Sequence, residues 1–151
     1  MLFSIMLPLH SIVRWLVVIA AVAVVGRALY AWLTKKDWTA LDDRLGMIFP
    51  MVMDIQVLVG LILYFFASPI TQTALKDFGQ AMKNADLRYF AVEHIFMMLV
   101  ALVVAHVGRA VSRKAATAPA KHRAAALLFS LSIVLVLASI PWFRPLLPFM
   151  G

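Results

Sequence analysis

The chain has 151 residues, a formal net charge of +7 and no cysteine, and 64% of its residues are hydrophobic, where a soluble domain averages roughly 45–50%. Only 14% of the residues are charged, so folding in water would leave a large apolar surface exposed, which argues for a lipid bilayer as the solvent. The absence of cysteine excludes disulfides, thiolate zinc sites, iron–sulfur clusters and covalently attached haem. The basic residues form no stripe with interleaved aromatic residues, so we expect no nucleic-acid partner.

Four stretches of about 20 apolar residues are each long enough to cross a hydrocarbon core of about 30 Å as a helix. They cover approximately residues 12–33, 47–67, 89–111 and 124–143. Together they take up more than half of the chain and leave no room for a soluble catalytic domain. The sequence therefore predicts an all-α integral membrane four-helix bundle, with residues 1–151 forming a single transmembrane domain.

Local signals mark the expected ends of these spans. The first span, residues 12–33, begins after Pro8, and proline suits a position in the first turn of a helix. No basic residue precedes this span and Arg14 lies inside it, so we expect it to stay in the mature protein and not to act as a signal peptide. The second span should stop at the turn of residues 67–69, and the fourth should end near residues 140–143.

The distribution of basic residues predicts the orientation in the membrane. The connections between spans one and two and between spans three and four hold eight Lys and Arg residues, against four on the opposite side. The eight are Lys35, Lys36, Arg44, Arg109, Arg113, Lys114, Lys121 and Arg123, and the four are Lys76, Lys83, Arg88 and Arg144. Because basic loops stay in the cytoplasm, both termini are expected on the non-cytoplasmic side.

The few polar residues inside the spans are the candidates for function, because a charge at mid-membrane costs about 2.5–3.5 kcal/mol. Spans one and three run in the same direction, so these residues separate into two groups. The outer group contains His10, Arg14, Glu93, His94 and Arg144, and the inner group contains Arg27, Asp54, His106, Arg109 and His122. Any activity is expected at one of the two groups.

The outer group predicts a b-type cytochrome. Haem iron in a membrane bundle is commonly held by histidines from two facing helices, with arginines neutralising the propionates. His10 and His94 would be the iron ligands of one haem b, and Arg14 and Arg144 would flank it.

The inner group offers a weaker second haem site, with His106 and His122 as ligands flanked by Arg109 and Arg123. The step of 12 residues from His94 to His106 turns the second histidine by about 120° around the helix. The expected heights of His106 and His122 in the membrane also differ by roughly 9 Å. The outer site is therefore favoured.

A structural role for the outer group stays open beside the haem hypothesis. Arg14 and Glu93 are expected at about the same depth in parallel spans. A buried ion pair between them, with His10 and His94 donating to it, would be a sufficient reason for all four residues.

The inner group has a structural alternative too. Asp54 paired with His106 or Arg27 would lock two helices together rather than carry protons. His122 lies between two basic residues, a position typical of a solvated side chain at the membrane surface.

Several short motifs along the chain resemble a known family. They are Leu9-His10-Ser11 with Arg14, Asp54 and Gln56 followed by Gly60-Leu61 and Leu63-Tyr64-Phe65, Leu87-Arg88-Tyr89-Phe90 with Glu93-His94, Gly108-Arg109, and Ile140-Pro141-Trp142. With them the chain resembles small bacterial four-helix inner-membrane proteins labelled cytochrome b. The resemblance implies the topology, a bacterial inner (cytoplasmic) membrane and haem. The second span has no histidine, unlike the better-understood four-helix b-type cytochromes, which argues against two haems.

Three classes of function follow from these features. The first is an electron-transfer cytochrome b that exchanges electrons with a membrane quinone near Tyr64, Glu93 and Trp142. The second is a non-catalytic accessory subunit that packs against a larger membrane (respiratory) complex. The third is a proton or small-solute conductor that uses Asp54, Glu93 and the histidines, which four short helices can hardly enclose without oligomerising.

Overall fold

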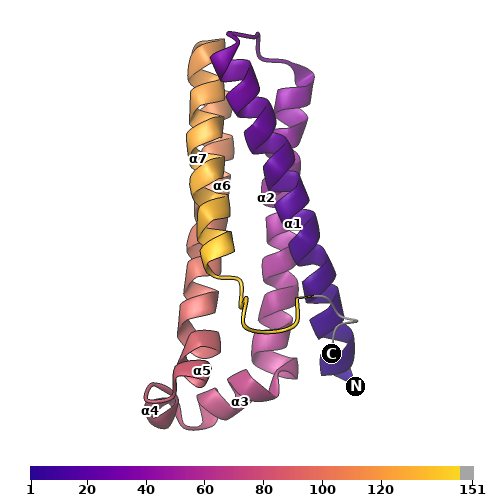
Figure 1. Ribbon diagram of the computed structural model, residues 1–151, viewed down its shortest axis with the longest axis vertical. Coiled ribbons are helices and arrows are strands. Elements are labelled where there is room, and N and C mark those ends of the chain that lie inside the picture. The colour runs from indigo at the N-terminus through magenta and orange to yellow at the C-terminus, as the bar shows by residue number, and fades with distance from the viewer. Residues whose placement is uncertain (147–151) are drawn as a thin grey trace.

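The computed structural model describes residues 1–146, and all of their regular secondary structure is helical (Figure 1). Four long helical segments each satisfy the length and apolar composition needed to cross a membrane. They are α1 (Leu2–Leu33), α2 (Ala40–Ile62) continued by a π-helix η1 (Leu63–Ala67), α6 (His94–Lys114) preceded by α5 (Ala85–Arg88) and a π-helix η2 (Tyr89–Glu93), and α7 (Ala118–Ala138). The protein is thus a small multi-span membrane protein.

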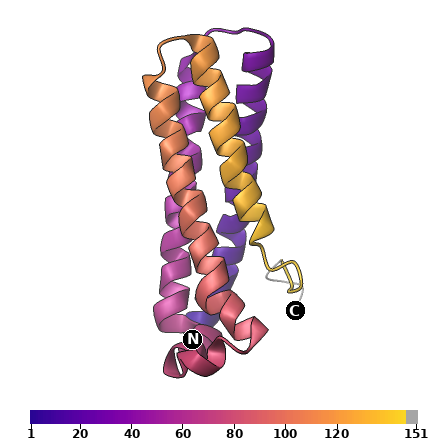
Figure 2. The ribbon, with the colours of Figure 1, turned by 90° about the vertical axis from the view of Figure 1, so that its left-hand side faces the viewer.

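The four long segments pack side by side as a bundle (Figures 1 and 2). Helix α1 packs against α2 and α7, and α6 packs against α7 and α2, so α1 and α6 lie on a diagonal of the bundle. Their common core consists largely of small and aromatic side chains, among them Ala21, Phe49, Ala105 and Phe129. Small residues allow helices to approach closely when lipid provides no hydrophobic driving force between them.

The outer surface of the long helices is apolar. Large hydrophobic side chains such as Leu16, Ile19, Val22 and Val134 are half or more exposed. Such a surface would be unfavourable in water and is the one that lipid chains cover. The helices are therefore in contact with a bilayer.

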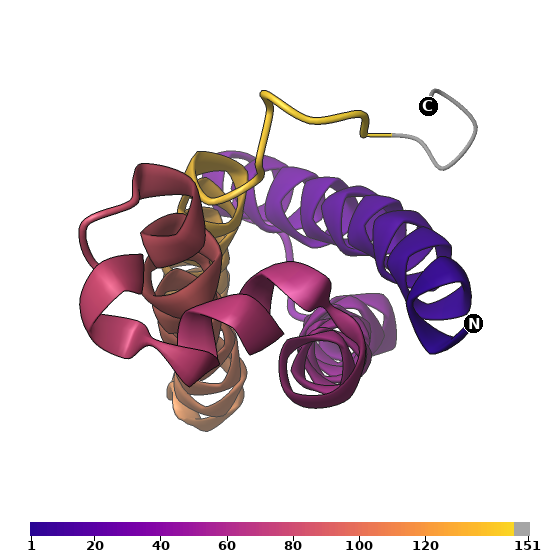
Figure 3. The ribbon, with the colours of Figure 1, turned by 90° about the horizontal axis from the view of Figure 1, so that it is seen from below.

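The connection between α2 and α6 forms three short helices, α3 (Pro69–Lys76), α4 (Phe78–Ala81) and α5. Each begins at a residue whose side chain accepts a hydrogen bond from a backbone N–H of the first turn: Ser68, Asp77 and Asn84, respectively. Viewed from below, these helices lie across the end of the bundle between α2 and α6 (Figure 3). They close the end that lies opposite the two short interhelical connections.

The first helix is longer than the sequence predicts. Helix α1 begins at Leu2 instead of near residue 12, and Pro8 lies inside it instead of in its first turn. The proline removes a single backbone hydrogen bond. Because backbone groups in lipid must be satisfied within their own helix, the apolar residues before Pro8 remain helical.

The last helix is shorter than expected at its end. Helix α7 begins at Ala118, where the Thr117 side chain accepts a hydrogen bond from the backbone N–H of Ala120, and it ends at Ala138 instead of near residue 143. Pro141 disfavours helical backbone at the residue before it. The segment after α7, residues 139–146, is therefore not helical and runs beside the lower half of the bundle (Figure 1).

Candidate functional site

A cavity of about 400 Å³ lies in the half of the bundle next to α3, and volumes of roughly 300–1,000 Å³ are usual for small-molecule sites. Its walls come from the first half of α1, the second half of α2, the start of α6 and the segment after α7. Both π-helices contribute to it, η1 through Tyr64 and η2 through Phe90. Most of the lining side chains are apolar. The polar ones are His10, Ser11, Arg14, Gln56, Tyr64, Ser68, Thr71, His94 and Arg144.

The structure brings His10 and His94 together at this cavity. Their ring centroids are 6.4 Å apart and their ring planes are inclined by 67°. His10 belongs to α1 and His94 opens α6, the two helices on the diagonal. The imidazoles therefore approach each other across the interior of the bundle.

The His94 ring is held in a defined orientation. Its Nδ1 lies 2.8 Å from the backbone oxygen of Ser139, which also accepts a hydrogen bond of 2.6 Å from the Tyr89 hydroxyl. A carbonyl oxygen only accepts, so the His94 proton is on Nδ1 and Nε2 carries the free lone pair. This arrangement is the one that metal-ligating histidines usually show.

The His10 ring lies against α2. The Gln56 amide nitrogen is 3.2 Å from His10 Nε2 and 3.1 Å from the His10 backbone oxygen. His10 Nδ1 and Gln56 Oε1 are buried without a hydrogen-bond partner among the described residues. A Cβ added at Gly60 would lie 3.2 Å from His10 Cε1, so the glycine leaves room for the ring.

Arg14 is a buried cation at the same cavity. Only 8% of the residue is exposed, and its guanidinium donates to the backbone oxygen of Leu146. Among residues 1–146, its Nε has no hydrogen-bond partner and no carboxylate forms an ion pair with it. A buried charge is costly without a counter-charge. The cavity is therefore suited to an anionic group.

The expected ion pair between Arg14 and Glu93 is not formed. Glu93 instead pairs with Arg88 at 2.8 Å, with 49% of its side chain exposed. Glu93 ends the π-helix η2, and its carboxylate points to the surface while the next residue, His94, lines the cavity. The structural interpretation of the outer group as an Arg14–Glu93 pair is thus wrong.

The segment after α7 supplies the remaining contacts of the site. Arg144 lines the cavity, with its guanidinium carbon 4.6 Å from the centroid of the Phe90 ring. Phe143 packs against the rings of Tyr89 and Phe90. Backbone oxygens of this segment accept hydrogen bonds from His94 and Arg14. The sequence could not predict these contacts, because every residue has a backbone carbonyl.

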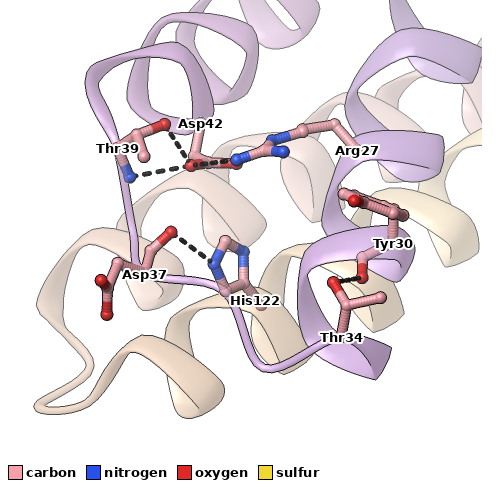
Figure 4. Close-up of polar contacts among 7 residues, drawn as sticks. All are labelled: Arg27, Tyr30, Thr34, Asp37, Thr39, Asp42 and His122. Atoms are coloured by element: carbon pink, nitrogen blue, oxygen red, sulfur yellow. Dashed lines mark hydrogen bonds and ion pairs between the residues drawn. The ribbon is translucent and has the colours of Figure 1, made fainter.

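The inner histidines are not brought together. His106 Nε2 lies 2.8 Å from Asp54 Oδ1 at the surface, with about half of each side chain exposed. His122 is fully buried, 5.0 Å from the ring of Trp38 and 3.3 Å from the backbone oxygen of Asp37 (Figure 4). The structure therefore gives no support to an inner haem. It also corrects the expectation that His122 is solvated.

The remaining inner charges join helices at the end away from the cavity. Arg27 binds both oxygens of Asp42, at 2.8 and 3.3 Å, and Thr39 donates to Asp42 from its backbone N–H and its hydroxyl (Figure 4). Arg109 binds Asp43 at 2.8 and 3.1 Å. Arg27 thus pairs with Asp42 and not with Asp54. Arg27 and Arg109 therefore join α1 and α6 to the start of α2 through two carboxylates, Asp42 and Asp43, that are absent from the predicted site residues.

The residues expected around a quinone do not share one place. Tyr64 lines the cavity and donates from its hydroxyl to the Ala91 backbone oxygen at 2.8 Å. Trp142 is 54% exposed and donates to the Leu137 backbone oxygen at 2.9 Å. Glu93 lies at the surface with Arg88. Of these three residues, Tyr64 is the one that lines the cavity.

Comparisons with family models, with curated proteins and with solved structures each found no match. Within residues 1–146, no three His, Cys, Asp or Glu side chains are grouped so that they could hold a bare metal ion. The geometry of the cavity is therefore what indicates a function.

Proposed function

We propose that this membrane protein binds one haem b in the cavity between His10 and His94 and carries electrons within the membrane as a b-type cytochrome. The observation that carries the proposal is the pair of imidazoles from diagonal helices, 6.4 Å apart, at one largely apolar cavity. Haem in membrane bundles is commonly held by two such histidines.

The separation of the rings supports one iron between them. A metal–nitrogen bond is about 2 Å long, and the nitrogen lies about 1 Å from the centre of its ring. Two imidazoles that bound the same iron would therefore have centroids about 6 Å apart. The observed 6.4 Å is close to this value. To bind iron through Nε2, His10 has to give up its contact with the Gln56 amide.

The hydrogen bond from His94 to Ser139 supports the same assignment. It fixes the tautomer that leaves Nε2 free, and it holds the ring against rotation. A partner on the second ring nitrogen also raises the basicity of a ligating histidine. His94 is therefore prepared to bind a metal before any cofactor arrives.

The charges at the cavity match an anionic cofactor. Arg14 is buried without a carboxylate among the described residues, and Arg144 lines the same cavity. Two guanidinium groups can neutralise and hydrogen-bond two propionates, as planar forks do for carboxylates. The other walls of the cavity are largely apolar, and bound haem would supply a one-electron iron couple there.

The proposal extends to the location of the protein. The excess of Lys and Arg at the end away from the cavity supports a cytoplasmic position for that end. The cavity would then lie toward the non-cytoplasmic side of a bacterial inner membrane, as the resemblance to the cytochrome b-labelled family also suggests. An electron partner would be reached from that side.

The test is a reduced-minus-oxidised absorption spectrum of protein purified from cells supplied with a haem precursor. We expect haem bands in the native protein and at least a tenfold loss of haem per protein in His10→Ala and His94→Ala. His106→Ala is the matched control, because this histidine lies outside the cavity. Circular dichroism and gel filtration check that each variant is folded.

Two results would contradict the proposal. One is a fully folded native protein without haem bands after haem supply. The other is a haem spectrum that persists in His10→Ala and His94→Ala as it does in the control His106→Ala, because other residues would then be the iron ligands.

A further inference from the structure

A polar pair faces outward on the apolar surface of the bundle. Asp54 of α2 and His106 of α6 are joined by a contact of 2.8 Å, and their side chains are 50% and 52% exposed. Asp54 lies near the centre of the segment Ala40–Ala67, about 20 Å from either end at 1.5 Å per residue. A carboxylate cannot reach water over that distance by extending its side chain.

The surroundings of this pair are apolar and exposed. The surface that we call the α2–α6 face consists of Met51, Asp54, Leu58, Leu99, Val103 and His106, which lie at helical spacing on two neighbouring helices. Each of its four apolar members is at least 41% exposed. Polar residues within membrane spans almost always face other protein or a water-filled space. Lipid alone is therefore a poor cover for this face.

The other charged pairs of the bundle differ in this respect. Asp42 is almost completely buried where it meets Arg27, and Arg109 is largely buried where it meets Asp43. Both of these pairs are close to the end of the bundle, in the first turn of α2. Among the ion pairs of residues 1–146, Asp54 and His106 form the pair that lies on the apolar surface of the long helices with about half of each side chain exposed.

We infer that the α2–α6 face is the interface of a homodimer in which two copies are inserted in the same direction. The contact uses only Asp54 Oδ1 and His106 Nε2. In an imidazolium–carboxylate pair, His106 Nδ1–H remains as a donor and Asp54 Oδ2 as an acceptor. Asp54 Oδ2 and His106 Nδ1 have no hydrogen bond within the described part of the chain. A two-fold axis along the membrane normal brings the acceptor of one copy to the donor of the other, twice. A second copy is thus complementary in charge to the first at the same depth.

The first experiment is disulfide cross-linking in membranes, for which the absence of cysteine in this chain is an advantage. Leu58→Cys lies on the α2–α6 face, and Val134→Cys on α7 is its matched control because the two residues are 60% and 59% exposed. With copper phenanthroline we expect covalent dimers of Leu58→Cys, Met51→Cys or Val103→Cys and none of Val134→Cys. Absence of dimers in all three face variants, equal cross-linking of the control, or a product with the mass of a different protein would overturn the homodimer.

The second experiment measures dimerisation itself by single-molecule photobleaching in liposomes at several protein-to-lipid ratios. Asp54→Leu should weaken the dimer about tenfold, which corresponds to the loss of two interhelical hydrogen bonds of ordinary strength in membranes. The exchange Asp54→His with His106→Asp should restore the native affinity, because it keeps both groups in the pair. Native affinity in Asp54→Leu, or no recovery in the exchange variant, would contradict the inference.

The dimer and the haem proposal can fail separately. His10 and His94 lie at the cavity inside the bundle, away from the α2–α6 face. A haem-free His94→Ala variant should therefore dimerise as the native protein does. Dimerisation without haem in every preparation would leave the interface standing and remove the cytochrome.

Discussion

Gly26 and Gly108 occur in the same tetrapeptide, Val-Gly-Arg-Ala, in α1 and in α6, but their surroundings differ. A Cβ added at Gly108 would lie 3.0 Å from the Phe129 ring and 3.1 Å from Leu128 Cβ, whereas one added at Gly26 would meet nothing within 4 Å. The close packing of α6 on α7 therefore depends on Gly108. Gly26 is not needed for packing.

The two glycines predict opposite effects of the same substitution. Gly108→Ala should destabilise the bundle by about 1–3 kcal/mol, because the added methyl group overpacks the contact with α7. Gly26→Ala should stabilise it by about 0.5–1 kcal/mol, because alanine favours a helix over glycine. Unfolding in increasing SDS, followed by circular dichroism, measures both. If Gly108→Ala stabilised the protein, the prediction would be wrong, and the Phe129 ring would have to move aside at little energetic cost.

At the scale of single residues, the sequence predicts which side of a helix a side chain occupies better than it predicts the side chain's hydrogen-bond partner. The 12-residue step from His94 to His106 indicates different sides of one helix, and the structure has His94 at the cavity and His106 on the outer surface. Glu93 was misjudged because equal depth does not fix the direction of a side chain. The partners of His94 and Arg14 are backbone oxygens, which no residue type indicates.

At the scale of elements, the start of α2 joins two neighbouring helices through adjacent residues. Asp42 binds Arg27 of α1, and Asp43 binds Arg109 of α6. Successive residues of a helix point about 100° apart, so two carboxylates in sequence can reach two helices. The signal was present in the sequence as two acids in the first turn after Thr39, with an arginine in each facing span.

The two carboxylates should differ in their contribution to stability. The side chain of Asp42 is 2% exposed and that of Asp43 is 45% exposed. Asp42→Asn should therefore cost about 3 kcal/mol, because it leaves Arg27 without its buried counter-charge, and Asp43→Asn should cost about 1 kcal/mol or less. Titration with SDS measures both, and equal losses would contradict the difference in burial.

Hydropathy located all four long helices but not their ends. Apolar runs mark the hydrocarbon-spanning part, whereas the ends depend on caps and prolines. The short helices α3, α4 and α5 escaped prediction because four to eight residues with ordinary polarity carry no detectable period. The π-helices η1 and η2 could not be predicted either, since a single added residue per turn leaves no compositional trace.

At the scale of the whole molecule, the two ends of the bundle differ in charge. Eight Lys and Arg residues lie in or beside the connections at the end away from the cavity, and four lie toward the other end. This asymmetry is the physical basis of the proposed orientation, because basic segments resist transfer across the membrane. Composition and the distribution of basic residues therefore indicate the number of spans and their orientation without reference to any single contact.

Cysteine labelling of intact cells tests that orientation. Lys83→Cys lies in the connection between α2 and α6, and Lys36→Cys lies in the connection between α1 and α2; both positions are exposed. A membrane-impermeant maleimide should label Lys83→Cys after the outer membrane is made permeable, and Lys36→Cys only after the inner membrane is opened. The reverse pattern would place the cavity on the cytoplasmic side.

The segment that follows α7 also sets the order in which the site can assemble. The Ser139 oxygen that orients His94 and the Leu146 oxygen that binds Arg14 are both synthesised after the four long helices. The cavity is thus incomplete while the ribosome is still inserting the bundle. Any cofactor or other ligand that depends on these contacts joins the protein after membrane insertion, and a chain cut short within residues 139–146 would insert normally yet lack a finished site.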